Sequence, residues 1–217
     1  MTTRFSDLPK RVQRLPTDRR GFPVPWFVAW RDGEPQFPVV DAAKLGVAWA
    51  GELCWVCGDK LGALRGWVVG PMSALEGATP EPPSHYDCAR FSVRCCPHLS
   101  TPTAKPSARY GEAEGYAAQA NVSKLRSGAT AIWVTRGRGA TPFHAGGGLL
   151  FGLEGPERLE WYAAGRPASA ADVRAAIARV LPTLRRVAER EGRAPDLARR
   201  LQWLDRWTPT EAASREG

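Results

Sequence analysis

Two short pairs of cysteine and histidine residues carry the clearest chemistry in this sequence. Cys54 and Cys57 are separated by two residues, with Gly58 directly after them, and His85 and Cys88 follow after 27 intervening residues. A tight turn between two cysteines can bring both sulfurs to one ion, and glycine tolerates the backbone shape with which such a turn exits. Residues three apart on a helix point the same way, so His85 and Cys88 can share that ion. Three sulfurs and one imidazole nitrogen match a tetrahedral Zn²⁺ site.

Buried packing residues are the alternative to a metal site. Free cysteines are often buried in cytosolic proteins, and His85 would then be incidental. Disulfides are not favoured, because the N-terminus lacks the apolar core of a signal peptide and thiols in the cytoplasm stay reduced. We therefore predict a structural Zn²⁺ held by Cys54, Cys57, His85 and Cys88. Four protein ligands leave no open position for water or substrate, so the expected role is to stabilise the fold.

Cys95, Cys96 and His98 lie close to this set in the sequence but are not expected to belong to it. Cys95 follows Cys88 by seven residues on the same helical face, which places it about 10 Å further along a helix. Cys96 and His98 could form a reactive thiol pair or replace a ligand. Packing at a helix end is the interpretation that we favour for them.

The residues between and around the two pairs suggest the scaffold. Residues 67–72 could form a β-hairpin, and Ser84 could cap a helix that carries the second pair. The turn that carries Cys54 and Cys57 is called the knuckle below. A knuckle, a hairpin and a ligand-bearing helix form the treble-clef arrangement, which HNH endonucleases also use. Residues 64–72 contain no histidine, however, and His85 is already needed as a ligand, so nuclease chemistry of that kind is disfavoured.

Turn and capping residues predict the N-terminal elements. Asp32-Gly33 between two aromatic, β-prone runs predicts a hairpin, because both residue types tolerate a positive φ. Asp41 is a candidate N-cap for a helix that ends at Gly51. Strands are expected over residues 129–135 and 147–153, joined by a flexible basic connection over 136–144.

The C-terminal part has helical periodicity. Apolar residues recur at steps of three and four from Val173 to Val187. Pro182 lies inside this pattern, so we expect a kink or break near Val180. A second amphipathic helix, entered through Pro195, follows.

Together these elements predict an α+β fold with an N-terminal β-hairpin and helix, a zinc treble clef, and a small antiparallel sheet with C-terminal helices. The expected segments are a basic flexible arm (1–20), the hairpin plus helix (21–51), the zinc module (52–99), a linker or loop (100–128), the small sheet plus helices (129–207) and a tail (208–217).

The basic residues gather near the two ends of the chain. The net charge is +8, from 30 Lys and Arg against 22 Asp and Glu. Residues 1–20 and residues 157–207 carry +4 each, whereas residues 21–156 carry only +1. Since 25 of the 30 basic residues are arginine in a chain rich in Ala, Gly and Pro, codon bias could supply part of this charge. The ends are nevertheless where a nucleic-acid or acidic-protein surface is expected.

A resemblance to a known family covers most of the chain. Residues 21–33, 54–58 and 81–85, together with Gly70-Pro-Met72 and Cys96-Pro97, resemble a family of bacterial and phage proteins for which no activity is established. Residues 161–168 fit the C-terminal helical part of that family. The resemblance implies one folded unit with a treble-clef-like zinc module and says nothing about a substrate.

These observations lead to one functional hypothesis and one alternative. We expect a zinc-stabilised cytoplasmic binding protein, with no membrane span, that contacts nucleic acid or an acidic protein through Arg11, Arg14, Arg19, Arg20, Arg185, Arg186 and Arg190. The alternative is a small-molecule enzyme with its site between the treble clef and the C-terminal sheet. A cavity shared by two or more of Cys96, His98, Arg136 and His144 would favour that alternative.

Overall fold

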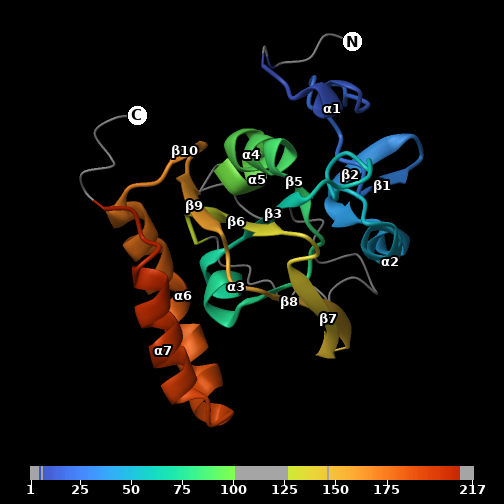
Figure 1. Ribbon diagram of the computed structural model, residues 1–217. Coiled ribbons are helices and arrows are strands. Elements are labelled where there is room, and N and C mark those ends of the chain that lie inside the picture. Colours follow the sequence, from blue (N-terminus) through green and yellow to red (C-terminus); the bar gives the residue numbers. More distant parts are fainter. Residues whose placement is uncertain (1–4, 6, 101–126, 146, 211–217) are drawn as a thin grey trace.

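A five-stranded antiparallel sheet joins the cysteine-containing segment to the C-terminal part of the chain (Figure 1). The computed structural model describes residues 5, 7–100, 127–145 and 147–210. In the order β10-β9-β6-β3-β5, the sheet contains β10 (Arg166–Pro167), β9 (Arg158–Ala163), β6 (Thr130–Arg136), β3 (Leu64–Val69) and β5 (Ser84–His85). Because β3 pairs with β6 along its whole length, the predicted zinc module and the predicted small sheet share one sheet.

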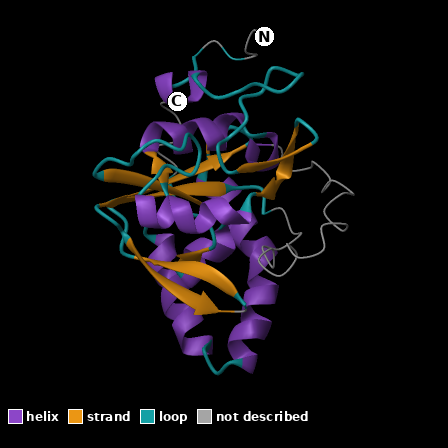
Figure 2. Ribbon diagram, turned by 90° about the vertical axis from the view of Figure 1, so that its right-hand side faces the viewer, coloured by secondary structure: helices purple, strands orange, loops and turns teal. Residues whose placement is uncertain are grey.

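Helices cover both faces of this sheet (Figures 1 and 2). On one face, α4 (Tyr86–Cys95) packs on β3 and β6, and the short α5 (Pro97–Ser100) follows it. On the other face lie α3 (Pro71–Glu76), α6 (Ala170–Arg190) and α7 (Ala194–Asp205). The predicted α+β class is therefore confirmed.

Strand β6 lies at the centre of the core. Ile132 and Val134 belong to the apolar cluster under α4, whereas Ala131 and Trp133 belong to the larger cluster under α3, α6 and α7. Burial on both faces is why this strand reads as a continuous apolar run rather than an alternating one. The neighbouring strand carries Gly66, where a Cβ would lie 2.8 Å from the Cβ of Ala89. Glycine at this position allows α4, which carries a predicted ligand, to lie close against the sheet.

The N-terminal hairpin and helix agree with the prediction. Strand β1 (Val28–Arg31) pairs with β2 (Glu34–Val40) around Asp32 and Gly33, whose φ angles are 51° and 75°. Two consecutive positive φ angles are what a type I′ turn requires. Asp41 caps α2 (Ala42–Gly51) by accepting a hydrogen bond from the Ala43 N–H.

Residues 136–144, expected to be a flexible connection, instead include most of a strand. Strand β7 (Ala140–Ala145) pairs with β8 (Gly148–Leu153), and β8 also pairs with β4 (Ala78–Thr79) in a separate three-stranded sheet. After Ala140 every residue of β7 is exposed, so the strand has no apolar alternation from which to predict it. Pro142 is compatible with its position at the sheet edge, where a missing N–H breaks no ladder.

The C-terminal part differs from expectation in two places. Residues 161–168, expected in the helical part, form the end of β9 and the strand β10, joined at Ala164 and Gly165 with positive φ angles. Helix α6 runs unbroken through Pro182. Val180 and Leu184 on either side of the proline are both buried in the core, so tertiary packing supports the helix on both sides of Pro182.

Some expectations concern residues that the structure does not describe. Most of the expected linker (100–128) and of the tail (208–217) lies outside the described residues. Among the described helices, none combines the length and the apolar character that a membrane crossing needs.

Candidate metal centre

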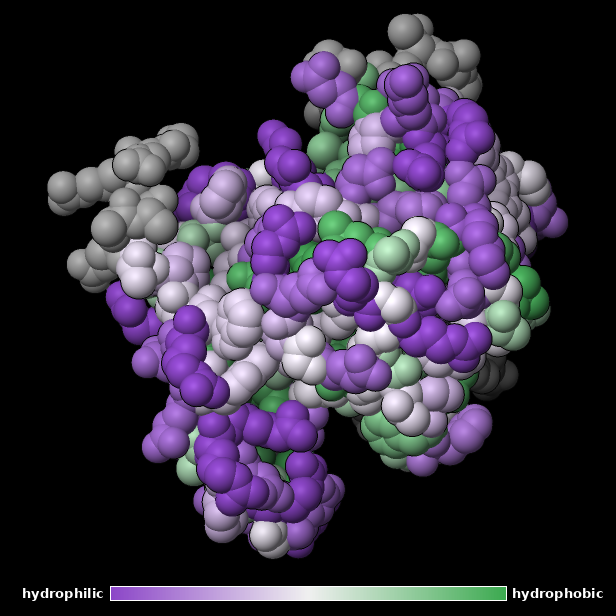
Figure 3. Space-filling model, in the orientation of Figure 1, coloured by the Kyte–Doolittle hydropathy of each residue, from purple (hydrophilic) through white to green (hydrophobic). Residues whose placement is uncertain are grey.

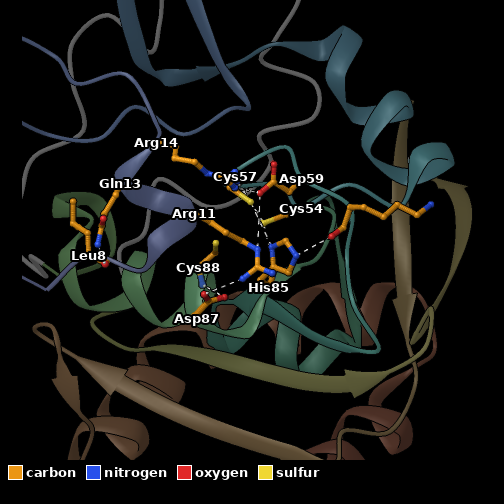
Figure 4. Close-up of polar contacts among 11 residues, drawn as sticks. Leu8, Arg11, Gln13, Arg14, Cys54, Cys57, Asp59, His85, Asp87 and Cys88 are labelled. Carbon is orange, nitrogen blue, oxygen red and sulfur yellow. Dashed lines mark hydrogen bonds and ion pairs between the residues drawn. The ribbon is translucent and has the colours of Figure 1, made fainter.

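The four predicted ligands lie together. One potential ligand atom from each of Cys54, Cys57, His85 and Cys88 lies within 4.8 Å of the others, although 27 residues separate the pairs in sequence. This is the only group of three or more such side chains found among the described residues. Figure 4 shows the four side chains turned toward one another. They can hold one metal ion.

Backbone hydrogen bonds form the turn that carries the first pair. Leu53 and Lys60 make an isolated β-bridge, and the Gly58 N–H donates to the Cys54 carbonyl over 2.8 Å. Gly58 has a φ of +76°, and a Cβ there would lie 2.9 Å from the ring of Trp26. Both the backbone shape and the close approach of Trp26 therefore require glycine at this position.

The second pair is positioned by the junction between β5 and α4. His85 is the last residue of β5 and the residue before the first turn of α4, and Cys88 lies within that turn. The helix thus begins one residue later than expected, and Ser84 lies in the strand rather than at the cap. The pairing of His85 with Arg65 on β3 fixes the ligand to the central sheet.

Hydrogen bonds to Cys54 favour its ionised form. Its Sγ accepts from the backbone N–H of Cys57 over 3.4 Å and from that of His85 over 3.3 Å. Each of these donors comes from a residue that is itself a candidate ligand, so the two pairs are tied together through the same sulfur. Donors directed at a sulfur stabilise a thiolate, which is the form that binds metal.

The imidazole of His85 is oriented by a second hydrogen bond. Its Nε2 lies 2.9 Å from the carbonyl oxygen of Lys60, and its Nδ1 lies 3.4 Å from the Sγ of Cys57. A carbonyl can only accept, so Nε2 carries a proton and Nδ1 is the nitrogen that faces the three sulfurs. Histidine ligands in metal sites are commonly oriented in this way by their other nitrogen.

The ionisation of the cluster also fits a cation at its centre. Hydrogen bonding to Cys54 and Cys57 raises the pKa of the Cys88 thiol, because a second charge beside an ionised sulfur is disfavoured. Burial would raise the pKa of Cys54, but hydrogen bonds from Cys57, Cys88 and His85 outweigh that effect and lower this pKa. Cys54 thus readily forms a thiolate whereas Cys88 resists ionisation, so thiolates at both of these residues need a compensating cation.

The neighbouring cysteines do not join the cluster. Cys95 is the last residue of α4, and burial raises the pKa of its thiol. Cys96 and His98 follow at the end of the helix and the start of α5. None of these three belongs to the four-ligand group, which agrees with the expectation that they lie at a helix end.

The predicted contact arginines lie at opposite ends of the molecule. Figures 1 and 2 both place the N-terminal helix α1 (Lys10–Gln13) at one end and the turn between α6 and α7 at the other. At the first end, Arg11 and Arg14 form ion pairs with carboxylates of the cysteine-containing segment, Arg20 pairs with Asp18, and Arg19 is exposed. At the other end, Arg190 pairs with Glu191, and Arg185 and Arg186 are exposed with no ion pair to any described residue.

The expected flexible arm (1–20) is not a free arm: several of its described residues pack against the rest of the protein. Leu8 and Val12 are buried in one apolar cluster with Cys54 and Cys88. The sequence reasoning missed these two residues, because a four-residue helix is too short for a periodic pattern. It also missed Asp59 and Asp87, whose only signal was their position beside the ligands.

The residues proposed for the alternative enzyme site do not converge. Arg136 ends β6 and pairs with Glu157, His144 is exposed on β7, and Cys96 and His98 follow α4. Two hollows in the described surface, of about 390 and 140 Å³, are lined by none of these four residues. The arrangement therefore gives no support to a small-molecule active site built from them.

Comparison of the chain with family models, with curated proteins and with solved structures gives no match.

Proposed function

We propose that this protein is a zinc-stabilised binding protein for nucleic acid or another acidic macromolecule. The observation that carries the zinc assignment is the convergence of three sulfurs and the Nδ1 of His85 within 4.8 Å. Soft thiolates combined with one imidazole suit Zn²⁺ in tetrahedral geometry. Four protein ligands complete that geometry, so the ion would stabilise the scaffold rather than bind substrate.

The neighbouring elements support a treble-clef assignment for this module. The knuckle at Cys54 and Cys57 leads into β3, β3 pairs with β5, and α4 begins directly after β5 with the second ligand pair. Helix α3 and strand β4 lie between β3 and β5 as an insertion. The motifs at residues 54–58 and 81–85 support membership of the bacterial and phage family that the sequence resembles. The five cysteines form no disulfide, which is compatible with a cytoplasmic location where thiols stay reduced.

The C-terminal end is the better-supported surface for an acidic partner. Arg185 and Arg186 are exposed and without an ion pair among the described residues. Figure 3 shows that the visible face of α6 and α7 is mainly hydrophilic. Arg11 and Arg14, in contrast, are engaged by carboxylates of the chain itself. Guanidinium groups left without an internal partner are available to phosphate or carboxylate groups.

Two measurements test this proposal. The first is the metal content of the purified native protein by mass spectrometry, for which we expect one zinc ion per chain. Metal-free, stably folded protein would contradict the zinc assignment.

The second measurement is binding to duplex DNA and to single-stranded RNA at several salt concentrations. Affinity should fall steeply with salt, and the R185Q/R186Q variant should lower the slope of log K against log salt by about two. The R31Q/R94Q variant removes the same charge from exposed positions on β1 and α4 and should leave the slope unchanged. Binding that is absent or independent of salt would refute the acidic-partner part of the proposal.

A further inference from the structure

A short N-terminal segment lies across the metal cluster (Figure 4). This segment, residues 8–14, is called the N-terminal cover below. Leu8 and Val12 place their side chains in the apolar cluster that contains Cys54 and Cys88, and Val12 and both cysteines are 0% exposed. The side chains of Cys54 and Cys88 are thus shielded from water together with a part of the chain that lies 40 or more residues earlier in the sequence, whereas Cys57 is only partly buried.

Ion pairs attach the cover beside both ligand pairs. The Nη1 of Arg11 lies 3.6 Å from a carboxylate oxygen of Asp87, and its Nε lies 3.9 Å from one of Asp59. Arg14 donates a hydrogen bond to the same oxygen of Asp59. Asp59 follows Cys57 by two residues and Asp87 directly precedes Cys88. The two arginines therefore hold the cover against both parts of the module.

The charges of the cover complement those of a loaded metal site. Three thiolates, one neutral imidazole and a divalent ion carry −1 in total, and Asp59 and Asp87 add two more negative charges. Arg11 and Arg14 offset two of these three charges. Arg11 and Arg14 thus have partners within the chain, so two of the positive charges of residues 1–20 are used without any external ligand.

The N-terminal cover keeps its folded conformation only by packing against the rest of the protein. Its helix α1 has four residues and no side-chain cap at its N-terminus. A helix of that length is not stable alone in water. Packing of Phe5 edge-on against Phe22 and Phe91 and the contacts of Leu8 and Val12 hold the segment in place. It can therefore lift from the module without disturbing the central sheet.

We propose that the N-terminal cover gates exchange of the metal ion by excluding water and chelators from the sulfurs of Cys54 and Cys88. This inference rests on the proposed zinc site and adds a role for Arg11, Val12 and Arg14 in covering that site. Removal of the metal must break its bonds to the buried Cys54 and Cys88 as well as to the partly exposed Cys57, so release is faster from the state in which the cover has lifted. Conversely, loss of the ion weakens the surface on which the cover packs.

The experiment measures the rate at which bound Zn²⁺ passes from the intact protein to a chromophoric chelator. The V12A variant and the R11Q/R14Q variant should each release the metal about tenfold faster, the lower end of the effect usual for outer-shell residues. Both should still bind one zinc ion per chain when loaded. The R31Q/R94Q variant has the same net charge as R11Q/R14Q and should release zinc at the wild-type rate.

Hydrogen exchange of residues 8–14 gives an independent readout. Amide protection in this segment should be lost when the chelator removes zinc, while protection of β6 is retained. Unchanged release rates in both cover variants, or protection of residues 8–14 that is insensitive to zinc, would overturn the inference even if zinc is bound stoichiometrically. Failure of the wild-type protein to bind zinc would instead overturn the proposed function, and the inference with it.

Discussion

Loss of one metal ligand is the perturbation that tests the scaffold most directly. In the C57S variant, a hydroxyl replaces the Sγ that lies 3.4 Å from the Nδ1 of His85. Serine is a poor zinc ligand, so the site keeps only two sulfurs and one nitrogen. The C95S variant makes the same chemical change at a cysteine outside the cluster and is the matched control.

The expected effect can be worked out for the knuckle and its flanks, residues 52–63. Ordering these twelve residues costs roughly 18 kcal/mol at about 1.5 kcal/mol each. Apart from the candidate ligand Cys54, the segment has three buried apolar side chains, Trp55, Val56 and Leu61, which stabilise it by roughly 7 kcal/mol. The remaining deficit of roughly 11 kcal/mol lies within the range of about 10–16 kcal/mol that structural zinc supplies in small modules. Without the ion, the knuckle should therefore unfold locally.

Tryptophan fluorescence reports this unfolding. Trp55 lies between the two cysteines of the knuckle, is 3% exposed, and stacks on Phe27 with ring centroids 5.0 Å apart. In C57S the emission should shift to longer wavelength as Trp55 becomes hydrated, and urea unfolding should begin at a lower concentration. C95S should behave as wild type in both assays. If C57S lost no metal, or lost it and stayed within about 1 kcal/mol of C95S in unfolding free energy, the reasoning would be wrong.

Three further predictions concern the core and the helices. In T135V the indole N–H of Trp67 loses its 2.9 Å hydrogen bond to the Thr135 hydroxyl and stays buried, which should lower the unfolding free energy in urea by about 1–3 kcal/mol. In G66A the new Cβ would lie 2.8 Å from that of Ala89, so α4 must move away from the sheet, at a cost of about 1–3 kcal/mol in the same assay. The backbone N–H of Ser169 lowers the pKa of Asp172 in the folded state. That contribution is present above the pKa of Asp172 in the unfolded chain and is lost as the pH falls through the depressed folded value. D172A should therefore cost about 1 kcal/mol at pH 7, with a difference from wild type that shrinks in thermal melts as the pH falls through the depressed folded pKa of Asp172.

Each of these predictions has an outcome that contradicts it. T135S keeps the hydroxyl, so a T135V variant no less stable than T135S would show that the hydrogen bond contributes nothing. A G66A protein of wild-type stability would mean that α4 does not lie as close to β3 as described. A stability difference between D172A and wild type that stays unchanged as the pH is lowered far below the ordinary carboxyl range would exclude the charged carboxylate as its cause.

Local signals in the sequence predict those elements whose formation depends only on residues close to one another in the sequence. Asp32-Gly33 specifies its turn because both residues accept a positive φ, and Asp41 caps α2 through its own side chain. Strand β7 could not be predicted in this way, since its exposed residues lack alternation and its pairing partner sets its conformation. Helix α6 likewise passes through Pro182 because tertiary packing outweighs the loss of one backbone hydrogen bond.

The sequence by itself determined the four candidate ligands of the metal centre. The types and spacing of Cys54, Cys57, His85 and Cys88 suffice, because a two-residue turn and a first helical turn each place two ligands on one side. Only the tertiary structure decided how the N-terminal charge is used. Composition counts Arg11 and Arg14 as free positive charge, whereas their carboxylate partners lie more than 40 residues away in the chain. Contacts of that kind depend on how the chain folds back on itself, and no local pattern in the sequence records them.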